Sequence, residues 1–246
     1  MSDPSPDAQL TQLRALLTTA TQRLLGSTIV VTDQEWAGAS RLPGWTRAHV
    51  ATHLARQADG LARLVDGAAS GERRLMYASP EAREAEIEDG AGRTGLELQT
   101  DLDTSAGHLT QAFTHLDRAD PADGGRGWGA QVEMRGGVVV PARLLPLARL
   151  LEVELHHVDL DVGHEVEQIE PGVAEWLIEL VAFRARARDE FPRVELHTGS
   201  GFTTTVGSVG PPRVVHGPAP ALLGWLTNRL DASAVDGADG LRLPSL

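Results

Sequence analysis

Hydrophobic residues recur at helical spacing over four long stretches of the chain, with polar segments between them. The spacing predicts helices over residues 7–25, 46–69, 94–117 and 142–163. Thr46 is placed to cap the second of these helices, and Ser79 followed by Pro80 marks the start of a shorter one. Long amphipathic helices joined by loops are typical of an antiparallel bundle.

The pattern changes behind the fourth helix, where β-branched and alternating residues surround a cluster of glycines. This predicts a β-hairpin between two further helices, and therefore an α+β chain with a helical domain at 1–168 and a small α+β domain at 169–246. The elements expected in the second domain are a helix over 172–190, hairpin strands at 194–198 and 202–206, a strand at 214–215, and a helix over 219–230.

The charge of the chain narrows the possible partners. There are 22 basic and 34 acidic residues, for a net charge of -12, which disfavours a nucleic-acid or anionic-membrane binder. No apolar stretch is long enough to span a membrane, and the N-terminus lacks the basic-then-apolar pattern of a secretory signal. We expect a cytoplasmic protein, and a monomer because no heptad seam is present.

Two residue types are missing, and both absences bear on chemistry. The chain contains no cysteine and no lysine. Cysteine-ligated metals, protein thiol nucleophiles and lysine Schiff bases are therefore excluded. If sulfur chemistry takes place in this protein, the sulfur must arrive with a ligand.

Two pairs of side chains have the spacing of metal ligands. Glu152 and His156 lie four residues apart on the fourth predicted helix, and His49 and His53 have the same spacing on the second. Such pairs share one helix face, and facing helices of a bundle can hold a metal ion jointly. Two nitrogens and one carboxylate oxygen would leave the open position of a catalytic zinc site.

The spacing alone leaves other interpretations open. Glu152 and His156 could be a solvated pair, or His157 could be the ligand if the helix faces differently. Asp159 could accept a hydrogen bond that orients an imidazole, or could be a charge near a helix end.

Three separated motifs occur in the order found in a known family. The runs are Gly44–Leu54 (GWTRAHVATHL), Met76–Arg83 (MYASPEAR) and Glu152–Leu160 (EVELHHVDL). Together they resemble the mycothiol-dependent maleylpyruvate isomerases, and Asn228-Arg229 resembles a pair in the family's last helix.

The resemblance implies a DinB-like four-helix bundle followed by a sterol-carrier-like α+β domain. It also implies a divalent metal, Zn²⁺ by preference, held by His53, Glu152 and His156, with mycothiol as the second cofactor. The family's catalytic, substrate-binding arginine falls on Arg229, and Arg83 is a second candidate for a substrate carboxylate.

The implied reaction converts maleylpyruvate to fumarylpyruvate, a step of gentisate-type aromatic catabolism. A metal-activated thiolate would add to the cis double bond, allow rotation, and leave again. Other functions of the same bundle are a mycothiol S-transferase acting on another electrophile, a metal-water hydrolase, or a metal- or ligand-binding module without turnover. An arginine that binds carboxylates favours the isomerase.

Overall fold

The structure is a computed structural model that describes residues 5–119, 126–186, 188 and 190–244. The chain divides into two compact units, Met1–Gly163 and His164–Leu246, where the sequence predicts a boundary after residue 168. Helices dominate the first unit and the second combines helices with a small sheet, so the structure is of the predicted α+β class.

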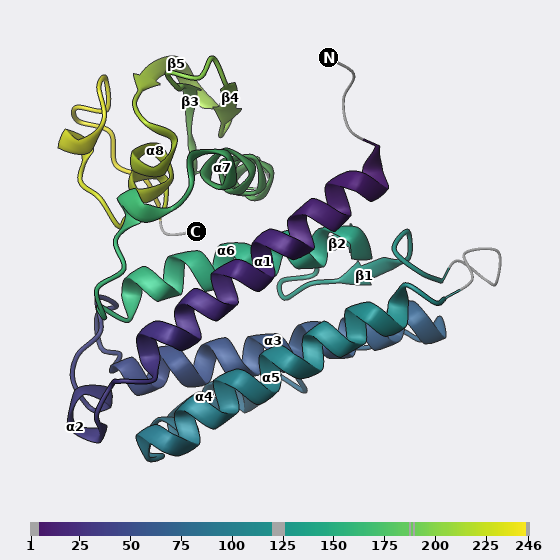
Figure 1. Cartoon of the computed structure of the whole chain (residues 1–246). Coiled ribbons are helices and arrows are strands. Elements are labelled where there is room, and N and C mark those ends of the chain that lie inside the picture. Colours follow the sequence, from purple (N-terminus) through teal and green to yellow (C-terminus); the bar gives the residue numbers. More distant parts are fainter. Residues whose placement is uncertain (1–4, 120–125, 187, 189, 245–246) are drawn as a thin grey trace. The chain divides into compact units, whose positions relative to one another are not determined.

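The first unit is built on the four long helices that the hydrophobic spacing predicts (Figure 1). The helices are α1 Pro6–Thr28, α2 Asp33–Trp36, α3 Arg47–Ser70, α4 Pro80–Ala91, α5 Gly95–Leu116 and α6 Leu145–Asp159. Side chains cap several of their N-termini: Thr46 caps α3, Ser79 caps the shorter α4, and Thr94 caps α5.

The directions of the four long helices differ from a simple antiparallel bundle. Contacts between α3 and α5 follow the same order along both helices. Arg93, just before α5, bonds Thr52, and Asp101, further along α5, bonds Arg56, further along α3. These two helices therefore run parallel, and the reason is that α4 intervenes and carries the chain back (Figure 1). Helix α6 runs antiparallel to α3, since Arg149 lies beside Gln57 while His156 lies beside His53.

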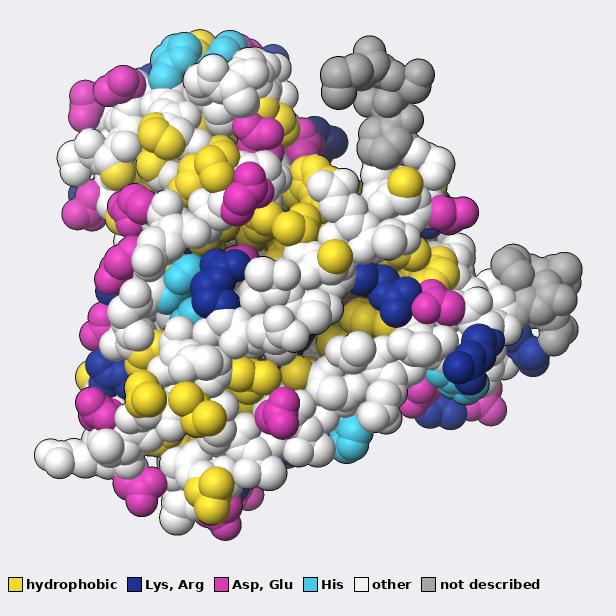
Figure 2. All heavy atoms as spheres, in the orientation of Figure 1, with side chains coloured by type: hydrophobic (Ala, Val, Ile, Leu, Met, Phe, Trp, Pro, Cys, Tyr) yellow, Lys and Arg dark blue, Asp and Glu magenta, His cyan; other side chains and the backbone are white. Residues whose placement is uncertain are grey.

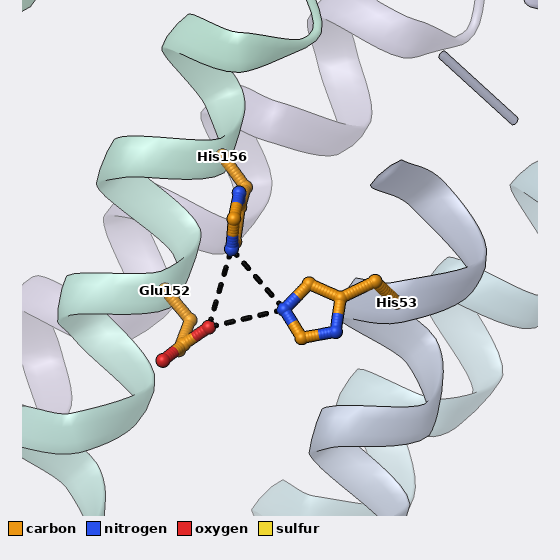
Figure 3. A group of neighbouring side chains, drawn as sticks. All are labelled: His53, Glu152 and His156. Carbon is orange, nitrogen blue, oxygen red and sulfur yellow. Dashed lines mark hydrogen bonds and ion pairs between the residues drawn. The ribbon is translucent and has the colours of Figure 1, made fainter. Parts of the chain in front are cut away.

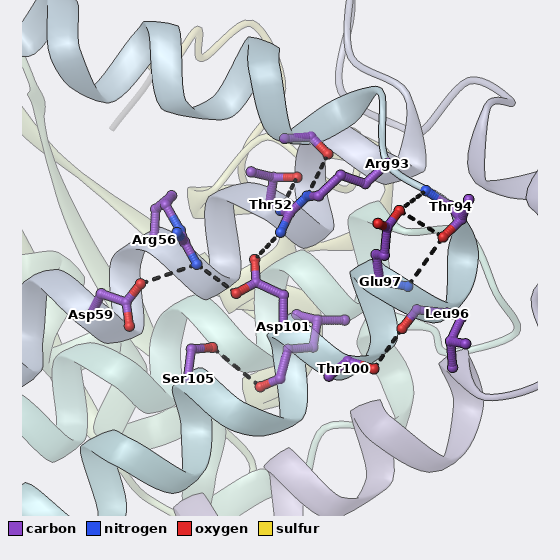
Figure 4. A network of polar contacts seen from close by, with 12 residues as sticks. Thr52, Arg56, Asp59, Arg93, Thr94, Leu96, Glu97, Thr100, Asp101 and Ser105 are labelled. Carbon is purple, nitrogen blue, oxygen red and sulfur yellow. Dashed lines mark hydrogen bonds and ion pairs between the residues drawn. The ribbon is translucent and has the colours of Figure 1, made fainter.

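The α3–α5 interface carries a charged network (Figure 4). Asp101 accepts from Arg56 at 2.6 Å and lies 2.8 Å from Arg93. Its side chain is 19% exposed, and it pairs with two half-buried guanidinium groups between the helices, of which that of Arg56 also lies 3.1 Å from Asp59. This network joins α5 to the helix that carries His53.

Helix α6 is shorter than the predicted helix over 142–163. A 3-10 turn, Ala142–Leu144, precedes it, and Pro146 lies in its first turn, where a missing N–H costs nothing. Asp161 adopts a left-handed backbone conformation with φ 55°, which ends the helix. Strands β1 Gln131–Glu133 and β2 Val139–Pro141 form an antiparallel hairpin before it.

The second unit holds a three-stranded sheet and two helices that pack together. The elements are α7 Pro171–Ala185, β3 Pro192–His197, β4 Thr203–Val206, β5 Val209–His216 and α8 Ala219–Leu226, with 3-10 turns at Val166–Gln168 and Ala232–Ala234. Strand β3 pairs antiparallel with β4, as the predicted hairpin requires, and parallel with β5 on its other side.

The last helix also ends earlier than the predicted residue 230. Asn228 takes φ 59°, and the backbone N–H groups of Asn228 and Arg229 donate to Trp225 and Gly224 carbonyls. This is a Schellman-type helix end, which asparagine tolerates better than most residues. None of the helices in the described ranges is both long and apolar enough to cross a membrane.

Candidate metal centre

Three side chains from two facing helices of the first unit converge on one point (Figure 3). His53 Nε2 lies 3.2 Å from Glu152 Oε2 and 3.1 Å from His156 Nε2. The third side of the triangle, from His156 Nε2 to Glu152 Oε2, is 3.3 Å. His53 comes from α3, and Glu152 and His156 come from successive turns of α6. Among the described residues, these three are the one group of histidine and acidic side chains whose ligand atoms gather closely enough to hold a metal ion.

The N-terminus of α3, the helix that carries His53, is stabilised by local contacts. Thr46 and His49 form a capping box, in which His49 N donates to Thr46 Oγ1 and Thr46 N donates to His49 Nδ1. His49 is thus used at the helix end and does not join the cluster. The Trp45 ring lies 5.6 Å from the His53 ring and 6.2 Å from that of His49, so it packs along the same helix face.

Each histidine of the cluster has a partner at its second nitrogen. His156 Nδ1 lies 2.8 Å from Asp159 Oδ2, and the Asp159 side chain is 1% exposed. A carboxylate in this position holds the imidazole with its Nδ1–H toward Asp159 and its Nε2 toward the cluster. His53 Nδ1 accepts from Arg83 Nη2 at 3.0 Å. Asp159 therefore orients an imidazole, and His157 does not reach the cluster.

The electrostatics of the three groups follow from burial and mutual contact. Burial lowers the pKa of His53 to about 4, against the opposing effect of its bond to Glu152. Burial acts to raise the pKa of Glu152, but hydrogen bonds from His156 and His53 outweigh it and hold that pKa well below its usual range. Burial also acts to lower the pKa of His156, yet its bonds to Asp159 and Glu152 raise that pKa overall.

The donor set fits a divalent metal ion. Three ligands at zinc bond lengths in tetrahedral geometry lie about 3.3 Å from one another, and the observed separations run from 3.1 to 3.3 Å. Two imidazole nitrogens and one carboxylate oxygen are a common set for a zinc site with an exchangeable fourth position. The side chains of Glu152 and His156 are 21% and 14% exposed, so the centre is accessible rather than closed.

The two predicted substrate arginines lie in different units. Arg83, on α4, is half-buried, bonds His53, and has its guanidinium 5.7 Å from the Tyr77 ring. Arg229 lies beyond the end of α8 in the second unit, where its Nη1 donates to the Thr227 carbonyl at 2.7 Å. This bond satisfies a carbonyl of the helix end.

One residue close to this centre, Arg149, was not among the site residues predicted from the sequence. Arg149 lies one turn before Glu152 on α6 and donates to the carbonyl of Leu54, the residue after His53. It therefore bridges the two helices that carry the metal-ligating side chains. An arginine flanked by leucines and alanine at a core-facing helical position was the available signal.

Comparisons with known proteins identify a family and a shared fold. The family model of the mycothiol maleylpyruvate isomerase N-terminal domain matches residues 17–161. Two crystal structures of a mycothiol-dependent maleylpyruvate isomerase, one of them a histidine-to-alanine mutant, are similar to this chain with a TM-score of 0.84 at 24% and 23% identity. In both comparisons the match covers 96% of this chain and 97% of the other, and at these identities it shows a shared fold. No curated protein sequence matches the chain.

Proposed function

Because this chain belongs to the family of mycothiol maleylpyruvate isomerase N-terminal domains, we propose that it is a metal- and mycothiol-dependent cis–trans isomerase. Its substrate would be maleylpyruvate and its product fumarylpyruvate. The observation that carries the proposal is the triangle of His53, Glu152 and His156, whose donor atoms have the separations of a divalent metal site. The absence of cysteine is consistent with a borrowed thiol.

The three donors would hold a divalent ion, with Zn²⁺ the preferred choice for this ligand set. Such an ion keeps a coordinated thiol deprotonated at neutral pH, which supplies the nucleophile needed to remove the double-bond character of the substrate. The protein's share is orientation: α3 and α6 fix the ligands, Asp159 fixes the His156 ring, and Trp45 packs against His53. A centre held in this way would keep the thiol beside the bound substrate, and such positioning of two reacting groups can contribute about 7–11 kcal/mol.

Arg83 would change partners when His53 acts as a ligand. In this structure the guanidinium donates to Nδ1, so the imidazole proton resides on Nε2. Ligation through Nε2 would require that proton to be on Nδ1, where a guanidinium has no acceptor to offer. Arg83 would then lose this bond and lie beside Tyr77, with its planar fork available to a carboxylate of the substrate.

Arg229 is the second proposed carboxylate-binding residue, and its assignment comes from the family resemblance. The substrate carries two carboxylates, and a chain with a net charge of -12 must supply cations locally to attract it. Arg229→Gln and Arg83→Gln should each raise KM for maleylpyruvate while leaving bound metal at one ion per chain. Loss of the metal in either variant would assign that arginine to the folding of the site instead.

The deciding experiment measures metal content and turnover on the same protein. Bound metal is quantified for wild type, His53→Ala and the control His49→Gln, and maleylpyruvate absorbance is followed with and without mycothiol. We expect thiol-dependent isomerisation in the wild type and in the control, and loss of both metal and activity in His53→Ala. One metal per chain without isomerisation would favour the S-transferase or, if no electrophile is consumed, a binding module. Absence of metal would refute the proposal.

A further inference from the structure

A groove separate from the metal centre runs between α1 and α5 of the bundle. Its volume is about 430 Å³, which is within the range of small-molecule sites. Hydrophobic side chains follow this seam on the molecular surface (Figure 2). His53, Glu152 and His156 do not line it. Its apolar walls come from Leu17 and Leu25 of α1 and from Leu109 and Phe113 of α5.

A buried arginine reaches this groove from α6. Arg149 lines it although the residue is only 2% exposed. Nη1 makes both of its hydrogen bonds, to the Leu54 carbonyl and to Gln57 Oε1, each at 2.7 Å. Burial lowers the pKa of Arg149 to about 10, so the guanidinium is still charged at neutral pH.

The charge of Arg149 has no direct counterion in the described part of the chain. Its two hydrogen-bond acceptors are neutral, and no described carboxylate forms an ion pair with it. The acid one turn further along α6, Glu152, is engaged by His53 and His156. A buried charge without a paired charge is costly, and such a position is suited to an anionic partner.

Several of the other polar groups of the groove already have partners within the protein. Arg14 pairs with both carboxylate oxygens of Asp117 at 2.8 Å and lies over the Phe113 and Trp128 rings. The hydroxyls of Thr18 and Thr110 donate to carbonyls of their own helices at 2.9 Å. Exposed Asp103, also in the lining, would repel a second anionic group.

We propose that this groove binds a small monocarboxylate with an apolar chain, the carboxylate facing Nε and Nη2 of Arg149 and the chain lying between α1 and α5. Because Arg149 is the cation without a direct counterion here, the groove favours a ligand with one carboxylate, and its apolar walls favour a ligand with an apolar chain. Because no metal ligand lines the groove, its occupant would be a separate ligand rather than the substrate. The inference therefore stands independently of the proposed isomerase reaction.

The test uses hexanoate as the probe on the full chain, with isothermal titration calorimetry and thermal unfolding as readouts. The uncharged hexan-1-ol and the dianion adipate are the matched comparison ligands. Two variants test the cation and the space of the groove separately: Arg149→Met removes the cation, and Gly107→Leu adds a bulky side chain to the lining. A Cβ at Gly107 meets no atom within 4 Å, so a side chain can begin there without a clash.

We expect wild type to bind one hexanoate per chain, at least ~10-fold tighter than hexan-1-ol or adipate, from the strength of charged hydrogen bonds. Arg149→Met and Gly107→Leu should each weaken hexanoate at least ~10-fold, while His53→Ala should leave it unchanged. If Arg149→Met fails to fold cooperatively, Gly107→Leu still decides. Unchanged binding in a folded Gly107→Leu variant, loss of binding in His53→Ala, or absence of saturable binding in the wild type would each overturn the proposal.

Discussion

Replacement of Asp159 by asparagine tests whether a buried carboxylate sets the metal affinity of the centre. Asp159 Oδ2 lies 2.8 Å from His156 Nδ1, and the carboxylate is 1% exposed. Asparagine has nearly the same shape and can still accept a hydrogen bond, so the change removes mainly the charge. Any loss of metal affinity then measures what the Asp159 charge contributes to metal binding by His156 Nε2, the nitrogen on the opposite side of the imidazole ring.

The size of the effect follows from the kind of hydrogen bond that is changed. A bond to a charged group contributes about 1.5–3 kcal/mol and a neutral one about 1 kcal/mol. The substitution should therefore cost about 0.5–2 kcal/mol of metal binding, or a ~2–30-fold higher Kd. Asp159 also raises the pKa of His156, so its loss weakens proton binding there too. The difference between variant and wild type should consequently shrink as the pH falls.

The assay is competition for Zn²⁺ with a chromophoric chelator, at a pH above the raised pKa of His156. The matched control is Asp161→Asn, two residues further on. Asp161 pairs with Arg41 and Arg47 at the surface and has a left-handed backbone conformation, which asparagine accepts. An unchanged Kd in Asp159→Asn, or an equal loss in the control, would refute the assigned role of Asp159.

Three further predictions concern stability. In metal-free protein, unfolding takes up a proton at His53 when the pH lies between the folded pKa of about 4 and the unfolded pKa of 6.5. Acidification should therefore destabilise wild type more than His53→Gln. The expected difference between about pH 7 and about pH 5 is up to about 2 kcal/mol by urea unfolding, and equal slopes would contradict it. Asp101→Asn takes the carboxylate away from Arg93 and leaves Arg56 paired with Asp59, so it should cost about 2 kcal/mol of stability. Exposed Asp103→Asn should cost under about 0.5 kcal/mol, and equal costs would count against the network. Gly95→Ala places a Cβ 2.7 Å from the Trp36 ring and should lower stability by about 1–3 kcal/mol, so an unchanged melting temperature would show that the ring yields freely.

The helices themselves could be predicted because their signals are local. Apolar spacing and the capping side chains Thr46 and Ser79 act within a few residues, and the structure places helix starts there. Helix ends were less accurate, since α6 and α8 stop at left-handed Asp161 and Asn228. Both residues carry ordinary polar side chains, and only the backbone path around them requires that conformation. The parallel direction of α3 and α5 also depends on how α4 packs, which spacing does not encode.

Glu152 and His156 could be paired from the sequence, because a spacing of four residues places them on one helix face whatever lies opposite. The composition likewise excludes cysteine and lysine chemistry. Spacing alone could not choose between His49 and His53, or decide whether Asp159 orients an imidazole. The packing of the helices resolves these points, since His49 caps α3 while His53 faces α6. It also brings Arg83 to His53 and Arg149 to the α1–α5 groove. These contacts join residues up to about a hundred positions apart, and only the way the helices pack fixes which of those side chains meet.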